Sequence, residues 1–127
     1  MTTGSLVQVA QRVEDIDRAV EFYESVLGLR LVARFESRDM AFFDLGDTRL
    51  LLGKDHYSSS LYLAVPDIDE SVRRLTAKGV RFERQPRLIF TDGDGQFGPV
   101  GTEEWMAFLW DSEGNLVGLV ERRAPAR

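Results

Sequence analysis

The feature that most constrains the fold of this chain is an internal repeat. The segment VEDIDRAV, which begins at Val13, returns as VPDIDESV from Val65. LGLRL follows the first copy and KGVRF follows the second, while MAFF at Met40 corresponds to MAFL at Met106. The matched pieces occur in the same order in both halves. A repeat of this length indicates that one supersecondary unit is present twice.

Each copy of the repeat begins with the pattern of a capped helix. Asp15 and Asp67 stand where a carboxylate accepts hydrogen bonds from the free N–H groups of a first helical turn. Gly28 and Gly79 fit the left-handed position just beyond a helix end. Between these limits, apolar residues recur at helical spacing, at Ile16, Val20, Tyr23 and Leu27 in the first copy and at Ile68, Val72 and Leu75 in the second.

One strand precedes each predicted helix, and three strands follow it. Apolar alternation and turn residues predict strands at 6–13, 29–36, 40–45 and 48–52, and again at 60–65, 80–90, 105–110 and 116–121. Alternation also assigns Val7 and Leu61 to strand faces beneath the helices. The 127 residues suit a single α+β domain. We expect module one at 5–52, a linker at 53–59, module two at 60–121 and a loose tail at 122–127.

Composition excludes several classes of partner. The formal net charge of -5 disfavours binding to nucleic acid or to an anionic membrane surface. The chain has no cysteine, which removes disulfides and thiolate chemistry and fits a reducing compartment. It shows neither a secretory signal pattern nor an apolar stretch long enough to span a membrane. We therefore expect a cytoplasmic protein.

Two phrases of the sequence resemble a known family. VEDIDRAVEFYESVLGL resembles the opening helix of the vicinal oxygen chelate superfamily, which contains glyoxalases, bleomycin-resistance proteins and dioxygenases. WMAFLWDSEGNLVGL resembles the closing hairpin of those proteins, and the likeness runs from about Leu6 to Glu121. It implies a glyoxalase-like fold, in which two tandem βαβββ modules form a cup of curled mixed sheet. Many relatives pair as dimers, so we expect a homodimer.

The resemblance also locates the positions at which metal-dependent relatives hold their ion. These positions are occupied by Gln8, Leu51, Ser60 and Gly118. A divalent cation needs several carboxylate or imidazole ligands, which this set does not supply. Glu121 does not replace them, because it lies three residues from Gly118 and strand alternation turns it to the opposite face. We predict neither a metal nor another cofactor.

The same resemblance and strand alternation predict the residues that line the cup, namely Gln8, Arg12, Phe42, Arg49, Ser60, Tyr62, Met106, Phe108 and Gly118. A wall of this composition is typical of a pocket for a small organic molecule. Phe42 and Phe108 would equally suit a packed core. Arg12 and Arg49, if they point inward, require a pocket or a salt bridge, because an unpaired buried charge is costly.

His56 is the only histidine and lies in the expected linker. Imidazole can serve as a base or a metal ligand near neutral pH. We interpret it as a solvated loop residue, because an isolated histidine is a motif match with a high rate of false positives.

The loop TDGDGQFGPVGTE matches two motifs incompletely. It contains GxGxxG, but Pro99 and Gly101 follow where a dinucleotide site needs a helix. Phe97 replaces the glycine of the sharp turn in an EF-hand, although the loop spaces its donors like a calcium loop, at Asp92, Asp94, Gln96 and Glu103. We expect a glycine-rich mobile flap that binds neither ligand.

Three functions fit these observations. The first is a metal-independent protein of the bleomycin-resistance type, which would sequester a small organic molecule in the cup. The second is a glyoxalase-like lyase, isomerase or dioxygenase that uses a divalent metal, and the third is a partner or regulatory module. The missing metal ligands favour the first.

Overall fold

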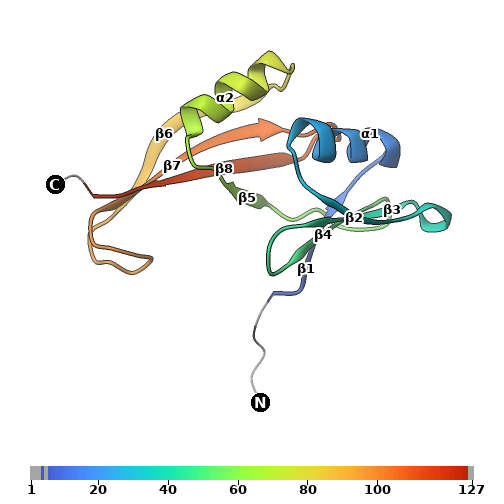
Figure 1. Ribbon diagram of the computed structural model, residues 1–127, viewed down its shortest axis with the longest axis horizontal. Coiled ribbons are helices and arrows are strands. Elements are labelled where there is room, and N and C mark those ends of the chain that lie inside the picture. The colour runs from blue at the N-terminus through green and yellow to red at the C-terminus, as the bar shows by residue number, and fades with distance from the viewer. Residues whose placement is uncertain (1–3, 5, 126–127) are drawn as a thin grey trace. The chain divides into compact units, whose positions relative to one another are not determined.

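The structure is a computed structural model that describes residue 4 and residues 6–125. The chain forms two compact units (Figure 1). The first unit ends at Ser59 and also contains Asp111–Asn115, whereas the second contains Ser60–Trp110 and the chain from Leu116 onward. The expected start of module one at Ser5 and residues 126–127 of the expected tail lie outside the described residues.

The first unit contains one four-stranded mixed sheet and one helical segment. Its elements are β1 (Gln8–Arg12), α1 (Ile16–Glu21) with a π-helical continuation (Phe22–Val26), β2 (Leu31–Phe35), a short 3-10 turn (Glu36–Arg38), β3 (Met40–Asp44) and β4 (Arg49–Gly53). The strand order is β1-β4-β3-β2, with β1 parallel to β4 and the other pairs antiparallel.

The second unit repeats this arrangement. It contains β5 (Leu61–Ala64), α2 (Ile68–Ala77), β6 (Phe82–Asp92), β7 (Thr102–Trp110) and β8 (Leu116–Arg123). The strand order is β5-β8-β7-β6, again with the first and last strands of the module parallel. The predicted β-α-β-β-β order, present twice in an α+β chain, is confirmed.

The limits of both helices follow the predicted capping residues. The Asp15 carboxylate accepts from the Arg18 backbone N–H at 3.0 Å, and the Asp67 carboxylate accepts from that of Glu70 at 3.1 Å. Gly28 and Gly79 adopt φ values of 78° and 89°, where residues with a Cβ are strained. These four predictions are confirmed.

Each sheet buries one face beneath its helix. In the first unit, Tyr23 and Ala19 cover a fully buried layer formed by Val13, Ala41, Phe43, Leu50 and Leu52. In the second, Ile68, Val72 and Leu75 cover Leu61, Ala107, Leu109, Val117 and Leu119. We call the sheet face opposite the helix the open face. Strand alternation assigns the predicted site residues within strands to the open faces.

Several predicted boundaries were wrong. Val7 precedes β1 and is 64% exposed, so it does not lie beneath a helix. Arg122 and Arg123 belong to β8 and not to a loose tail, because they pair in register with Glu104 and Glu103 of β7. Opposite charges across the ladder extend both strands beyond their apolar parts.

Within the described residues, no helix is both long and apolar enough to span a membrane.

Candidate functional site

A hollow of about 690 Å³ lies on the open face of the second sheet. It is lined by Tyr62, Ala64, Val65, Glu104, Met106, Val120 and Arg122. Strand pairing explains this grouping, because Ala64 pairs with Val120, which pairs in turn with Met106. The hollow is thus built from three adjacent strands, β5, β8 and β7.

Beside this hollow, two aromatic rings pack against a glycine. Tyr62 and Phe108 flank Gly118 in the strand register, and their rings meet edge to face with centroids 6.0 Å apart. A Cβ atom at Gly118 would lie 2.8 Å from Cδ2 of Tyr62 and 3.1 Å from Cε1 of Phe108. The absence of a side chain at Gly118 therefore makes room for both rings.

The charged groups of this hollow are paired with each other. Nε of Arg122 lies 3.1 Å from Oε2 of Glu104, whose side chain is only 15% exposed. The ion pair leaves the wall close to neutral. A neutral wall with exposed aromatic and aliphatic surface favours the uncharged part of an organic molecule.

A smaller hollow, of about 270 Å³, lies on the open face of the first sheet. It is lined by Val32, Ala33, Phe35, Phe42 and Arg49. The Nε–H of Arg49 donates to Oε1 of Gln8 at 2.8 Å, and its guanidinium carbon lies 5.5 Å from the ring centroid of Phe42. Phe35 meets Phe42 edge to face, with centroids 5.6 Å apart.

The structure brings most of the predicted site residues together in two sets and leaves two of them apart. Tyr62, Met106, Phe108 and Gly118 are brought together in the second unit, while Gln8, Phe42 and Arg49 are brought together in the first. Arg12 and Ser60 join neither set. Arg12 lies at the other end of β1 from Gln8 and forms an ion pair with Glu14, and Ser60 is an exposed residue just before β5.

The sequence prediction missed several residues of the two hollows, namely Val32, Phe35, Glu104, Val120 and Arg122. A signal for the last three was present, because they continue the two-residue alternation from Met106 and Gly118. The predicted strands stopped at Trp105 and Glu121, one residue short of the ion pair in each case. The missed contribution of Val32 follows from a register shift in β2 between Leu31 and Ala33, whereas Phe35 continues the regular alternation from Ala33.

The positions implied for a metal do not fit one. In the first unit they hold Gln8 and Leu51, and the amide oxygen of Gln8 already accepts a hydrogen bond from the cationic Arg49. In the second unit they hold Ser60, which is exposed, and Gly118, which two rings cover. Glu121 turns to the helix side, as expected, where its carboxylate accepts from the Ile68 N–H at 2.8 Å.

His56 differs from the expectation of a solvated residue. A Cβ atom placed on Gly53 would lie 2.6 Å from Cδ2 of His56, so the imidazole covers this glycine at the end of β4. The side chain is partly buried. The glycine leaves space for the ring, and His56 therefore packs against the sheet.

The glycine-rich loop after β6 is organised by its first aspartate. Asp92 is 2% exposed, and its carboxylate accepts from the backbone N–H groups of Phe97 at 2.8 Å and Gln96 at 2.9 Å. These bonds, and above all the one from Phe97, lower the pKa of Asp92, although burial by itself would raise it. Glu103 accepts from the Trp105 indole at 2.8 Å.

Across residues 4 and 6–125, no cluster of three or more His, Asp or Glu side chains could hold a metal ion.

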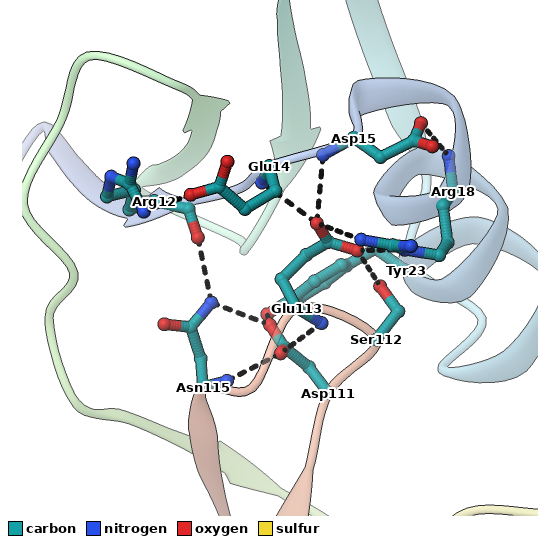
Figure 2. A network of polar contacts seen from close by, with 9 residues as sticks. All are labelled: Arg12, Glu14, Asp15, Arg18, Tyr23, Asp111, Ser112, Glu113 and Asn115. Carbon is teal, nitrogen blue, oxygen red and sulfur yellow. Dashed lines mark hydrogen bonds and ion pairs between the residues drawn. The ribbon is translucent and has the colours of Figure 1, made fainter.

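A polar network in the first unit joins the β7–β8 turn to the start of α1 (Figure 2). The carboxylate of Glu113 accepts from the N–H groups of Glu14 at 2.8 Å and Asp15 at 2.9 Å, and from the Arg18 guanidinium at 2.7 Å. Burial opposes ionisation of this carboxylate, but the bonds from Arg18 and the two backbone groups together lower the pKa of Glu113 to about 2.

A second carboxylate in this network binds a buried phenol. The Tyr23 hydroxyl donates to Oδ2 of Asp111 at 2.7 Å. Burial, followed by the negative charge of Asp111, raises the pKa of Tyr23. The backbone N–H groups of Glu113 and Asn115 donate to Oδ1 of Asp111 at 2.8 and 2.7 Å. Because donors of the chain itself satisfy these carboxylates, the network is structural.

A comparison with protein families agrees with the repeat and the fold. The model described as the glyoxalase/bleomycin resistance protein/dioxygenase superfamily matches residues 5–119. The chain belongs to this superfamily. This match covers the first module and nearly all of the second.

Among relatives by sequence, the chain is similar to a probable chloroplastic lactoylglutathione lyase of Arabidopsis thaliana, with 29% identity over 135 residues. The match covers 92% of this chain but 35% of the plant protein, so the chain spans about a third of that relative. It is also 28% identical over 99 residues to the uncharacterized protein YraH of Bacillus subtilis, covering 64% of this chain and 77% of YraH.

Solved structures show the same fold at low sequence identity. A lactoylglutathione lyase from Agrobacterium tumefaciens has a TM-score of 0.71 and 20% identity, covering 95% of this chain and 96% of its own. TnmS3, an antibiotic-binding protein from Streptomyces sp. CB03234, has a TM-score of 0.69 and 22% identity, covering 97% and 99%. One superfamily fold thus carries a lyase and a binding protein.

Proposed function

We propose that this protein binds a small organic molecule in the hollow on the open face of the second sheet, and that it does so without a metal ion. The observation that carries the proposal is the covering of Gly118 by the rings of Tyr62 and Phe108. A side chain long enough to coordinate a metal from this position would have to displace those rings. Aromatic and aliphatic walls with few polar groups are typical of sites for small organic molecules.

Two further observations support binding over metal-dependent catalysis. The ion pair between Glu104 and Arg122 joins the two charged residues that line this hollow, so a charged substrate would have to compete with an existing pair. TnmS3, which shares the fold over nearly its whole length, is named as an antibiotic-binding protein.

The binding site can be tested with 2-naphthol, an uncharged aromatic probe. In a titration of ¹⁵N-labelled protein, we expect saturable shifts of the amide signals of Tyr62 and Met106. Tyr62→Ala should weaken binding by about tenfold, because aromatic anchors contribute much of the binding energy at such sites. Tyr57→Ala is the matched control, since Tyr57 is 95% exposed and belongs to the other unit. Equal affinities of the wild type and Tyr62→Ala would contradict the proposal.

Metal independence needs a separate measurement. Protein purified without chelators should contain far less than one equivalent of zinc, nickel, iron or manganese. Added metal should leave the midpoint of thermal unfolding unchanged, because only an ion that binds the folded state raises it. Near-stoichiometric metal that is lost in Gln8→Ala would instead favour a glyoxalase-like lyase, isomerase or dioxygenase. The similarity to the plant lyase is the observation in favour of that second function.

We also propose that the protein works as a homodimer, as many members of the superfamily do. Support comes from β6, an edge strand of the second sheet, where Leu88, Ile89 and Phe90 are 43%, 42% and 37% exposed. A register shift interrupts regular alternation here, but Leu88 pairs with Trp105 and Phe90 with Glu104, which are consecutive residues of β7, so both faces of β6 are apolar at this point. Sedimentation should show a dimer that Ile89→Lys weakens, and a wild-type monomer would contradict the proposal.

A further inference from the structure

The hollow of the first unit differs from that of the second in carrying an uncompensated positive charge. Among the described residues, no carboxylate lies within ion-pair distance of the Arg49 guanidinium. Asp44 is its cross-strand partner in the β3–β4 register. The Asp44 carboxylate is bonded instead to Arg30 at 3.2 Å and to the Gly46 N–H at 3.1 Å. Arg49 therefore keeps its charge available at the rim of the hollow.

The guanidinium of Arg49 is held in place by neutral groups. Its Nε–H donates to the amide oxygen of Gln8, and its guanidinium carbon lies over the ring of Phe42, 5.5 Å from the ring centroid. These contacts fix the side chain but do not cancel its charge. Because Nε is already used, the two terminal nitrogens remain as a pair of parallel donors. Such a pair matches the two oxygens of a carboxylate.

The rest of the wall is apolar and small. Val32 and Phe35 are about half exposed, and Ala33 lies beside them on β2, while Phe42 on β3 separates β2 from Arg49 on β4. A volume of about 270 Å³ lies near the lower end of the range typical of ligand pockets. A molecule with a single ring suits this space better than a larger one.

We propose that the first unit binds a small aromatic monocarboxylate, with its carboxylate on the terminal nitrogens of Arg49 and its ring against Phe35 and Phe42. This inference rests on the proposed binding of a small organic molecule and names the chemical class of a ligand. Gln8 acts as a positioning residue, because it reaches the ligand only through Arg49. The two hollows then differ in the ligands they accept. The hollow at Arg49 binds an anionic group, whereas the hollow at Tyr62 is close to neutral and binds an uncharged one.

The experiment compares benzoate with benzamide, which has the same ring and nearly the same shape but no charge. In NMR titrations of labelled wild-type protein, benzoate should bind at least tenfold more tightly than benzamide. It should shift the Arg49 Nε–H and the Ala33 methyl signals. Its affinity should also fall as salt is added, because the partner charge is exposed to solvent.

Two variants separate recognition from folding. Arg49→Gln should remove the preference for benzoate, whereas Arg38→Gln, which changes an exposed arginine of the same unit, should keep it. Gln8→Glu keeps the length of the side chain and places a carboxylate on Arg49. It should abolish benzoate binding without lowering the midpoint of thermal unfolding, since it adds an ion pair.

The outcomes distinguish this inference from the proposed function. Equal affinities for benzoate and benzamide would overturn it, as would a Gln8→Glu variant that still binds benzoate. If 2-naphthol binds at Tyr62 but benzoate shifts no signal of the first unit, only the further inference fails. If neither probe binds, both proposals fail.

Discussion

Glu113 is the residue with the largest number of stabilising contacts in the first unit's polar network. Its side chain is inaccessible to solvent, and its two oxygens accept from backbone N–H groups, from Arg18 and from the Ser112 hydroxyl. A buried carboxylate is costly unless such donors compensate for its lost hydration. Burial opposes ionisation, but these donors outweigh it and lower the pKa of Glu113.

This arrangement predicts a loss of stability in acid. The pKa of Glu113 is about 2 in the folded protein, against 4.5 as the ordinary value. A depressed folded-state pKa stabilises the protein fully above the unfolded value, and this contribution is lost as the pH falls from 4.5 toward 2. The shift corresponds to at most about 3 kcal/mol, and we expect about 2 kcal/mol because Arg18 is half exposed. Because pH 3 lies between the two pKa values, urea unfolding at pH 7 and pH 3 should show somewhat more than half of this loss, about 1 kcal/mol.

Glu113→Gln provides the control for this pH dependence. The amide keeps the shape of the side chain but has no charge to lose, so the variant should be less stable at pH 7 and show a smaller loss at pH 3. Should the variant lose as much stability in acid as the wild type, other carboxylates account for the acid sensitivity.

At the scale of elements, the β7–β8 hairpin supplies a carboxylate to the start of each helix. The turn residue Glu113 accepts from the N–H groups before α1, and the β8 residue Glu121 accepts from the first N–H of α2. Each helix therefore has two acidic acceptors at its N-terminus, one at its own N-cap and one from the hairpin. The unpaired backbone N–H groups and the positive end of the helix dipole favour negatively charged acceptors at this end of a helix.

Because α2 has two acidic acceptors at its N-terminus, removing its N-cap should lower the free energy of unfolding only moderately. Asp67→Ala should lower the free energy of unfolding by about 1 kcal/mol, because Glu121 still serves the neighbouring N–H group. Asp69→Ala is the control for charge, since it removes an exposed aspartate of the same helical turn that makes no cap and whose ion pair with Arg123 is long, at 3.5 Å. A loss of equal size in both variants would show that charge alone, and not the cap, stabilises the helix.

The sequence predicted elements well where a local pattern determines them. The caps at Asp15 and Asp67 and the glycines after each helix set the helix limits, and those limits were confirmed. Strand ends were predicted poorly where polar side chains continue a ladder, as Arg122 and Glu104 do. A charged alternation has no apolar signal, and only the pairing of β7 with β8 reveals it.

The candidate site shows the same division. Alternation assigned Tyr62 to the cup and the family resemblance assigned Phe108 and Gly118, and three adjacent strands do place these residues side by side in register. Their role in binding stays a prediction. It also placed Arg12 in the group, although a local partner, Glu14, holds that side chain elsewhere. The bond between Gln8 and Arg49 joins β1 to β4. These two parallel strands are far apart in the sequence, so no local pattern predicts that the two side chains meet.

At the scale of the molecule, the path of the chain links the two units. Residues Asp111–Asn115 belong to the first unit, whereas β7 and β8, which flank them, belong to the second. The first unit is therefore incomplete without a turn that the second module supplies. We propose on this basis that the chain unfolds as one domain.

The two tryptophans make this proposal testable. Trp105 and Trp110 both belong to the second unit, whereas the bonding partners of the Glu113 side chain belong to the first. If the chain unfolds as one domain, Glu113→Gln should lower the urea midpoint of tryptophan fluorescence as much as the midpoint of far-UV circular dichroism, since two-state unfolding gives coincident transitions for all probes. Glu24→Gln, which changes an exposed glutamate of the first unit, should leave both midpoints in place. An unchanged fluorescence midpoint, together with an earlier separate phase in circular dichroism, would show that the two units unfold independently.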